Sequence, residues 1–289
     1  MEKIRTKILT SIISFIMVIA FLPAVTLNAD TNTWKYDAST KTLTISYNGA
    51  MPNYTYQSYT PWYKYEDDIT KIVIENGTTS IGNYAFSSFF NVKEIVWPTD
   101  GKLTSIGKYA FYCTGITEII LPTGITTIGE SAFGDCDQVT KLVLPSTLKT
   151  IGSGAFCAEN GMKFTSLSIP SKVTSIGTYA FARNTRLTTV TGGAGLVTIG
   201  SGAFLKCSKL VTFKITSPVL KTIGSHAFEG CSKLKTIYIQ KTTKLTKKTV
   251  KKSLCNSKVK TVKVKKSKVK TYKKYFTSKN CGRYVTVKK

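Results

Sequence analysis

The hexapeptide Ile-Gly-x-x-Ala-Phe occurs seven times in this chain, and its recurrence restricts the fold more than any other feature. Successive copies start 22 to 25 residues apart. A period of this length is typical of a solenoid, in which each repeat is one supersecondary unit that buries its apolar side against its neighbours. The Ile, Ala and Phe side chains of the hexad are therefore predicted to form the core. The hexads begin at Ile81, Ile106, Ile128, Ile151, Ile176, Ile199 and Ile223.

A short strand is predicted between successive hexads, because apolar residues alternate there with period two. The strand segments are 71–74, 93–98, 117–122, 140–145, 165–170, 212–215, 236–239 and 261–264. Proline is the last residue of four of them, where the backbone no longer has to donate a hydrogen bond to the neighbouring strand. The hexad glycine is expected to permit a tight turn into a short helical or irregular arc. The predicted fold class is a repeat solenoid: a curved, right-handed superhelix of parallel strands and short arcs, capped at both ends.

The pattern L-x-x-I-x-I-P followed by I-G-x-x-A-F-x-x-C resembles the BspA-like leucine-rich repeats of bacterial surface proteins. Segments 33–54 and 61–86 are similar to the N-terminal cap that precedes such repeats, and the likeness extends over residues 33–265. The resemblance implies a leucine-rich repeat fold, display at the cell surface, and adhesion to host or neighbouring cells. The chain departs from the pattern at 188–193, which lacks the strand proline, and after Phe228, where the hexad disappears.

The N-terminal residues have the pattern of an export signal. Lys3, Arg5 and Lys7 precede an apolar run over 8–22, and the small residue Ala29 follows. This pattern predicts a secretory signal peptide over 1–29 and a secreted or cell-surface protein. A retained membrane anchor is the alternative, although a spanning helix needs about 20 apolar residues. We expect no transmembrane segment in the mature chain.

The remaining chain divides into three predicted parts: an N-terminal cap (30–68), a leucine-rich repeat solenoid (69–240) and a basic C-terminal cap (241–289). Solenoids need caps because their end coils would otherwise expose core. The aromatic residues of the first part either seal the first coil, which we favour, or bind sugar rings. These aromatic residues are Trp34, Tyr36, Tyr54 and Trp62.

Positive charge is concentrated at the C-terminal end. Residues 231–289 contain 21 Lys and Arg and no Asp or Glu, whereas residues 30–230 contain 17 Lys and Arg and 14 Asp and Glu. Such asymmetry indicates an anionic partner for the tail. Because Val269, Tyr272 and Phe276 fall on one helical face, we expect a folded cap with a basic surface; a disordered basic tail is the alternative. The candidate polyanion-binding residues are Lys263, Lys265, Lys266, Lys270, Lys273 and Lys274.

Residues suited to catalysis are sparse, and we expect a protein that is not an enzyme. The only histidine, His226, occupies a variable position of the last hexad. Glu94 and Glu118 lie at equivalent strand positions one repeat apart; a glycosidase-like carboxylate pair is conceivable, but two solvated glutamates are the simpler interpretation. No phosphate loop, CxxC pair or metal-ligand spacing is present, so we expect no cofactor and no metal.

The seven cysteines follow the repeat in part. Cys207 and Cys231, like Cys136, lie three residues after a hexad Phe, and Cys255 is assigned an equivalent place after Leu254. A recurrent position indicates small buried hydrophobes. Adjacent coils are also close enough for a Cys207–Cys231 or Cys231–Cys255 disulfide. The sequence leaves the disulfide state open, and Cys281 falls outside the repeat.

Function in a solenoid usually lies on its extended sheet surface. If the alternating Ile, Leu and Val residues point inward, an outward column begins with four apolar side chains and becomes hydroxyl-rich and then basic. An apolar stripe of this kind marks a partner site, or reflects only the preference of β-branched residues for strands. The candidate partner-binding residues are Val73, Val96, Ile120, Val143 and Tyr238.

These observations favour a secreted or cell-surface binding protein that adheres through its strand face to a host or neighbouring-cell protein or glycan. The first alternative is a structural wall-associated protein, held by its basic C-terminal region to anionic wall polymers. A nucleic-acid binder is a weaker alternative, because an export signal argues against that role.

Overall fold

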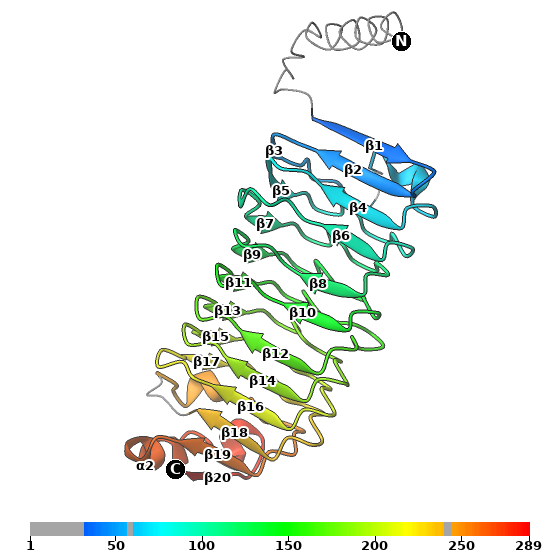
Figure 1. The fold of residues 1–289 in the computed structure, drawn as a ribbon. Helices are drawn as coiled ribbons and strands as arrows, with labels where there is room; N and C mark the ends of the chain where they lie inside the picture. Colours follow the sequence, from blue (N-terminus) through cyan, green and yellow to red (C-terminus); the bar gives the residue numbers. More distant parts are fainter. Residues whose placement is uncertain (1–31, 57–59, 240–243) are drawn as a thin grey trace, which may run out of the picture. The chain divides into compact units, whose positions relative to one another are not determined.

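Each hexad and the strand that follows it form one coil of a parallel β-solenoid (Figure 1). A computed structural model describes residues 32–56, 60–239 and 244–289, and the coils belong to one unit, Asn32–Lys289. The predicted signal peptide lies outside the described residues. Two columns of strands run along the stack, and we call them the front sheet and the hexad sheet. The solenoid of parallel strands predicted from the repeat is confirmed.

The front sheet contains the strands predicted from the alternating segments. Its strands are β1 (Thr33–Asp37), β2 (Thr42–Ser46), β4 (Lys71–Ile74), β6 (Glu94–Val96), β8 (Glu118–Ile120), β10 (Lys141–Val143), β12 (Ser166–Ile169), β14 (Thr189–Gly192), β16 (Thr212–Ile215), β18 (Thr236–Ile239), β19 (Thr261–Val264) and β20 (Thr286–Lys288). Strands β1 and β2 pair antiparallel, and the later pairs are parallel. In the described chain the sheet falls into three hydrogen-bonded blocks, with breaks between β6 and β8 and between β10 and β12.

The hexad sheet is a second parallel sheet, which the sequence did not predict. Its strands are β3 (Gly49–Ala50), β5 (Thr78–Ile81), β7 (Ser105–Ile106), β9 (Thr127–Ile128), β11 (Thr150–Ile151), β13 (Ser175–Ile176), β15 (Thr198–Ile199) and β17 (Thr222–Ile223). All of them contain only two to four residues, and all but β3 end in the hexad Ile, which is buried in every coil. The Ser or Thr before that Ile is aligned from coil to coil, so the sheet presents one hydroxyl row outward.

The hexad glycines serve close packing between coils, so the expected turn role is wrong. None of the seven lies in the left-handed region of backbone conformation. A Cβ placed on Gly177 would lie 2.5 Å from the carbonyl carbon of Gly152, and one on Gly152 would lie 2.5 Å from that of Gly129. The left-handed residue comes two positions later, as at Tyr109 (φ 55°). The coils therefore approach so closely here that only glycine fits.

The core is a stack of hexad phenylalanines. Phe111, Phe133, Phe156 and Phe181 are fully buried, and the ring centroids of successive members lie 5.3 to 5.6 Å apart with interplanar angles of 9° or less. Offset stacking of this kind adds to the free energy gained by burying the rings. The prediction that the hexad Ile, Ala and Phe form the core is confirmed.

Aromatic residues seal the N-terminal coil, near the short 3-10 helix η2 (Tyr63–Tyr65). Trp62 is fully buried, and its Nε1 donates a hydrogen bond to the carbonyl oxygen of Ala85 at 2.9 Å. The rings of Trp34 and Tyr54 contact it edge-on, with centroids 6.1 and 5.7 Å away. These contacts cover the first hexad Phe, as expected of a cap.

The described part of the basic tail is folded. It contains η3 (Lys248–Val250), η4 (Lys266–Lys268), α2 (Val269–Lys273) and α3 (Ser278–Cys281). Tyr272 and Phe276 are buried, and the amide nitrogen of Asn280 donates hydrogen bonds to the carbonyl oxygens of Lys247 and Tyr275. The alternative of a disordered tail is therefore wrong for residues 244–289. Among the described residues, no helix is long and apolar enough to cross a membrane.

Candidate functional site

Three apolar side chains of the predicted outward column face solvent on the front sheet. Val96 is 37% exposed, and Ile120 and Val143 are each 43% exposed. Val96 is aligned with Val73 on the neighbouring strand, and Ile120 with Val143. Val73 is only half-buried rather than fully exposed. These four residues, which we call the apolar column, occupy strands β4, β6, β8 and β10.

Two ion pairs between neighbouring strands flank the apolar column. The ammonium of Lys71 lies 3.0 Å from a carboxylate oxygen of Glu94, and that of Lys141 lies 3.7 Å from a carboxylate oxygen of Glu118. These residues are substantially exposed, so the pairs add little to stability. Each glutamate is thus engaged by its own lysine, which supports the interpretation of solvated surface residues over that of a paired acid and base.

The break between β6 and β8 opens a depression beside the apolar column, with a volume of about 400 Å³. Its lining residues are Lys93, Glu94, Ile95, Trp97, Thr117, Glu118 and Ile120. Trp97 is half-buried and packs edge-on against Phe111, with centroids 5.6 Å apart. Apolar surface with polar groups around it is the usual composition of a site that receives a side chain or small ligand.

Tyr238 lies apart from the apolar column, separated from β10 by β12, β14 and β16. It is aligned with Lys214 on one side and Lys263 on the other. The ammonium of Lys263 lies 5.6 Å from the centroid of the Tyr238 ring, a cation–π contact. The structure therefore assigns Tyr238 to the basic end of the front sheet and does not bring it together with the apolar column.

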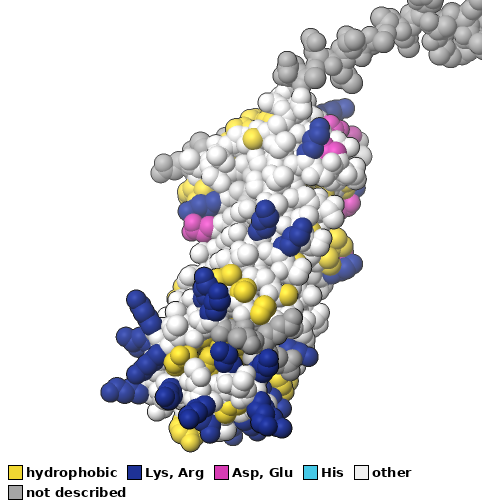
Figure 2. Space-filling view, turned by 90° about the vertical axis from the view of Figure 1, so that its left-hand side faces the viewer, with side chains coloured by type: hydrophobic (Ala, Val, Ile, Leu, Met, Phe, Trp, Pro, Cys, Tyr) yellow, Lys and Arg dark blue, Asp and Glu magenta, His cyan; other side chains and the backbone are white. Residues whose placement is uncertain are grey.

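The predicted polyanion-binding lysines occupy two surfaces. Lys263 lies on the front sheet, whereas Lys270 and Lys273 belong to α2 and Lys274 follows it. Figure 2 shows Lys and Arg side chains gathered over the C-terminal end of the stack, with Asp and Glu toward the other end. Among the described residues, no ion pair occurs after Glu229. The remaining candidates, Lys265 and Lys266, lie directly after β19.

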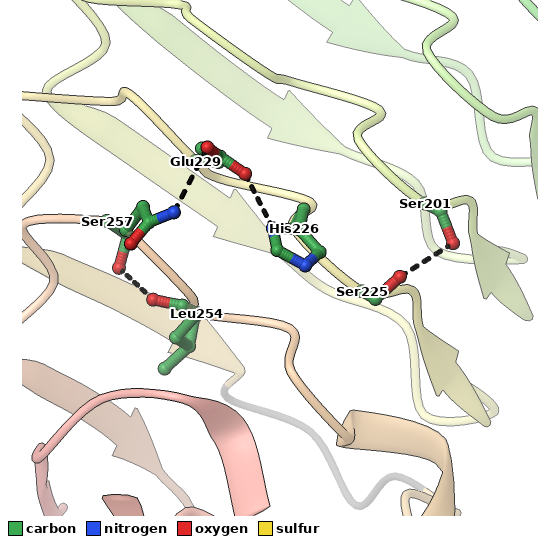
Figure 3. A network of polar contacts seen from close by, with 7 residues as sticks. Ser201, Ser225, His226, Glu229, Leu254 and Ser257 are labelled. Carbon is green, nitrogen blue, oxygen red and sulfur yellow. Dashed lines mark hydrogen bonds and ion pairs between the residues drawn. The ribbon is translucent and has the colours of Figure 1, made fainter.

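His226 takes part in a surface polar network that joins the last hexad coil to the C-terminal cap (Figure 3). Its Nδ1 lies 2.5 Å from a carboxylate oxygen of Glu229, and the other oxygen accepts a hydrogen bond from the amide nitrogen of Asn256 at 3.1 Å. The hydrogen bonds from Asn256 and then His226 hold the pKa of the Glu229 carboxyl below its usual value. The arrangement links two coils and gives the histidine a structural partner.

The recurrent cysteines are buried hydrogen-bond donors. The thiols of Cys136, Cys207 and Cys231 each donate to the carbonyl oxygen of the hexad Phe in the preceding coil, at 3.1 to 3.2 Å. Burial raises the pKa of Cys136 and of Cys231 to about 12, which leaves these thiols protonated and inert. All seven cysteines are free thiols in this structure.

The assignment of Cys255 to this recurrent position is wrong. Ser257 occupies it, three residues after Leu254, and its hydroxyl donates to the Leu254 carbonyl oxygen at 2.8 Å. Cys255 instead lies against Gly282. Leu254 replaces the hexad Phe in this coil, and Cys255 follows it by one residue rather than by three.

A second depression, of about 510 Å³, lies on the arc side and contains several carboxylates. The Tyr112 hydroxyl donates to Asp135 at 2.5 Å, and the Asn160 amide donates to Asp137 at 2.6 Å. In the part of the chain that the structure describes, no group of three or more His, Cys, Asp or Glu is arranged to hold a metal ion. These carboxylates mainly cross-link neighbouring coils.

The chain matches the family model of the BspA type leucine rich repeat region over residues 60–160 and 157–282. It belongs to this family. The resemblance drawn from the hexads and the strand prolines is thus confirmed, and the BspA-type repeats account for most of the solenoid. No curated protein matches the chain.

One solved structure supports the same fold for this BspA-type protein. A leucine-rich repeat protein from Bacteroides ovatus is 20% identical, with a TM-score of 0.52, over 90% of this chain and 75% of that one. A T. pallidum leucine-rich repeat protein is 21% identical, with a TM-score of 0.47, over 62% and 87%. At these identities the likeness concerns the fold alone.

Proposed function

We propose that this BspA-type protein is exported and acts at the cell surface as a binding protein. It adheres to a host or neighbouring-cell protein or glycan through the apolar column and performs no chemical turnover. The observation that supports this most is the exposure of Val96, Ile120 and Val143 on three successive strands of the front sheet, with Ile120 and Val143 directly aligned. Covering a group of exposed apolar side chains with a partner lowers the free energy, so such a group marks a binding surface.

The flanking features give this surface its selectivity. The Lys71–Glu94 and Lys141–Glu118 pairs present alternating charge beside the apolar column, and the depression at Trp97 accepts a protruding partner group. Rim charges of this kind mainly steer encounter and exclude wrong partners, whereas burial of the apolar side chains supplies affinity. Adhesion through this face should therefore resist high salt.

The test compares retention on immobilised mucin and extracellular-matrix proteins. The variant Ile120→Ser/Val143→Ser removes two members of the apolar column. Val211→Ser is the matched control, because Val211 is 57% exposed but lies outside the column. We expect the double variant to lose about tenfold or more in affinity at high salt, and the control less than about twofold. Equal retention of all three proteins would exclude adhesion through this face.

A second candidate function is attachment as a wall-associated protein through the basic C-terminal region. It is favoured by the absence of ion pairs after Glu229 among the described residues, which leaves the positive charges there uncompensated by the chain. Summed lysine charge attracts anionic polymers over several ångströms and weakens with salt. The two candidates use different ends of the front sheet and are compatible.

A further inference from the structure

We infer that the C-terminal half of the front sheet carries a linear site for an extended phosphodiester polymer of polyol units. Its charged residues are Lys214, Lys263 and Lys288, which we call the lysine ladder. The inference rests on the second candidate function and specifies both the surface and the ligand class. The site is distinct from α2, which contains the candidates Lys270 and Lys273 and is followed by Lys274.

The ladder follows from strand register. Lys214, Tyr238, Lys263 and Lys288 are mutually aligned on β16, β18, β19 and β20. Neighbouring strands lie about 4.8 Å apart, so the backbone positions of successive ladder lysines lie about 5 to 10 Å apart along one line. A polymer lying across the strands would meet these charges in sequence.

A row of hydroxyls runs beside the ladder. Thr212, Thr236, Thr261 and Thr286 are aligned on the same four strands, two residues before each ladder position. A threonine hydroxyl both donates and accepts hydrogen bonds, which suits the hydroxyls of a polyol between phosphates. Two exposed lysines, Lys235 and Lys260, precede β18 and β19 and extend the charge to the other side of this row.

The composition of the ladder suits a phosphate diester. Lysine binds phosphate as a compact point charge and needs no fixed bidentate geometry, so it tolerates a flexible diester. No carboxylate of the described chain pairs with Lys214, Lys263 or Lys288, so no acidic group neutralises these three charges.

A nucleic acid is disfavoured by the one aromatic residue on the ladder. Tyr238 is half-buried, and the ammonium of Lys263 lies over its ring. Binders of single-stranded nucleic acid use open aromatic faces on which successive bases stack, whereas the ladder offers a single half-buried tyrosine.

The test measures binding of linear poly(glycerol phosphate) to the whole protein by titration calorimetry at several salt concentrations. One variant carries Lys214→Gln, Lys263→Gln and Lys288→Gln. The matched control, called the α2 variant, carries Lys270→Gln, Lys273→Gln and Lys274→Gln, which removes the same charge from α2 and the residue that follows it. We expect the ladder variant to lose about tenfold or more in affinity and its salt slope to fall by about 3, and the α2 variant to lose about twofold. The single variant Lys263→Gln repeats the test with less perturbation.

The outcomes separate this inference from the function on which it rests. Equal loss in the two triple variants, or greater loss in the α2 variant, would show that the ladder is not the site, while attachment by the C-terminal region would stand. Tighter binding of oligothymidine than of poly(glycerol phosphate) would replace the ligand class with nucleic acid. Failure of the unaltered protein to bind the polymer even at low salt would exclude both the ladder and wall attachment. The Ile120→Ser/Val143→Ser variant should bind the polymer normally.

Discussion

The two sheets of the solenoid carry different constraints. In the hexad sheet nearly every position is fixed, because Ile points into the core and the following Gly packs against the backbone of the adjacent coil. In the front sheet only the inward residues are buried, and the outward residues change from apolar to hydroxyl to lysine along the stack. The hexad sheet therefore maintains the stacking, and the front sheet is free to vary its surface.

The largest expected effect in this comparison comes from the phenylalanine stack. Phe156 lies between Phe133 and Phe181, with ring centroids 5.6 and 5.3 Å away. Phe156→Ala should lower the free energy of unfolding by about 4 kcal/mol, because it removes a buried ring and leaves a cavity. Urea denaturation followed by circular dichroism measures the loss. A change below about 1.5 kcal/mol would mean that neighbouring coils collapse into the space.

The hexad glycine should come next. In Gly177→Ala the added Cβ meets the backbone of Gly152 at 2.5 Å, and backbone cannot swing aside as a side chain can. We expect a loss of about 2 to 3 kcal/mol in the same assay. Ser153→Ala is a suitable control, because Ser153 is exposed in the same region of the stack. A control as damaging as Gly177→Ala would contradict the close-packing explanation.

The buried side-chain amide of Asn184 provides a third test, because it holds the backbone of two neighbouring hexads together. Asn184 donates to the carbonyl oxygens of Phe156 and Phe181 at 2.8 and 3.0 Å and accepts from the backbone nitrogen of Met162 at 3.1 Å. Asn184→Ala should cost about 2 kcal/mol, because it leaves buried backbone groups unpaired. Hydrogen exchange should show faster exchange of the Met162 amide; unchanged protection there would argue against this role.

The front sheet should tolerate substitution much better. Val143→Ser should change the free energy of unfolding by less than about 0.5 kcal/mol, because the side chain is 43% exposed. Thermal melts beside those of Phe156→Ala provide the direct comparison. A loss of more than about 1.5 kcal/mol would show that the apolar column belongs to the folding core and would weaken its assignment as a binding surface.

The smallest expected effect is on stability at acid pH and comes from the Glu229 carboxyl. The Glu229 carboxyl has a folded-state pKa below its usual value, so its contribution to stability is present above that value and is lost as pH falls. Glu229→Gln should therefore flatten the acid side of the stability curve, by less than about 0.5 kcal/mol because the network is partly exposed. Urea midpoints measured between neutral and acid pH provide the comparison, and an unchanged slope would contradict the role of the Asn256 and His226 contacts.

Much of the architecture could be predicted because repetition amplifies weak signals. One copy of Ile-Gly-x-x-Ala-Phe is uninformative, but seven copies identify the buried faces and the strand spacing. The hexad sheet was missed because strands such as Ser105–Ile106 have no alternating pattern to detect. The role of glycine was misjudged because contact between coils is a tertiary property that leaves no local signature.

The candidate surfaces were predicted in part. Period-two alternation gives the direction of Ile120 and Val143, and the structure places both outward. The depression at Trp97 could not be foreseen, because it depends on the failure of β6 and β8 to pair. The placement of Tyr238 beside Lys263 depends on the register between β18 and β19, and the segment that joins these strands lacks the hexad.

The hexad sheet pairs each coil with the next without a break from β3 to β17, so the coils follow one another at a regular spacing. The apolar column and the lysine ladder both lie on the front sheet, the column across the two N-terminal blocks and the ladder in the third, and the coils between them set their separation. Inserting or deleting one whole repeat would change that distance in steps of about 4.8 Å while leaving both surfaces intact. The number of repeats therefore sets the distance between an attached polymer and a bound partner. Duplication of a single repeat would lengthen it by one step.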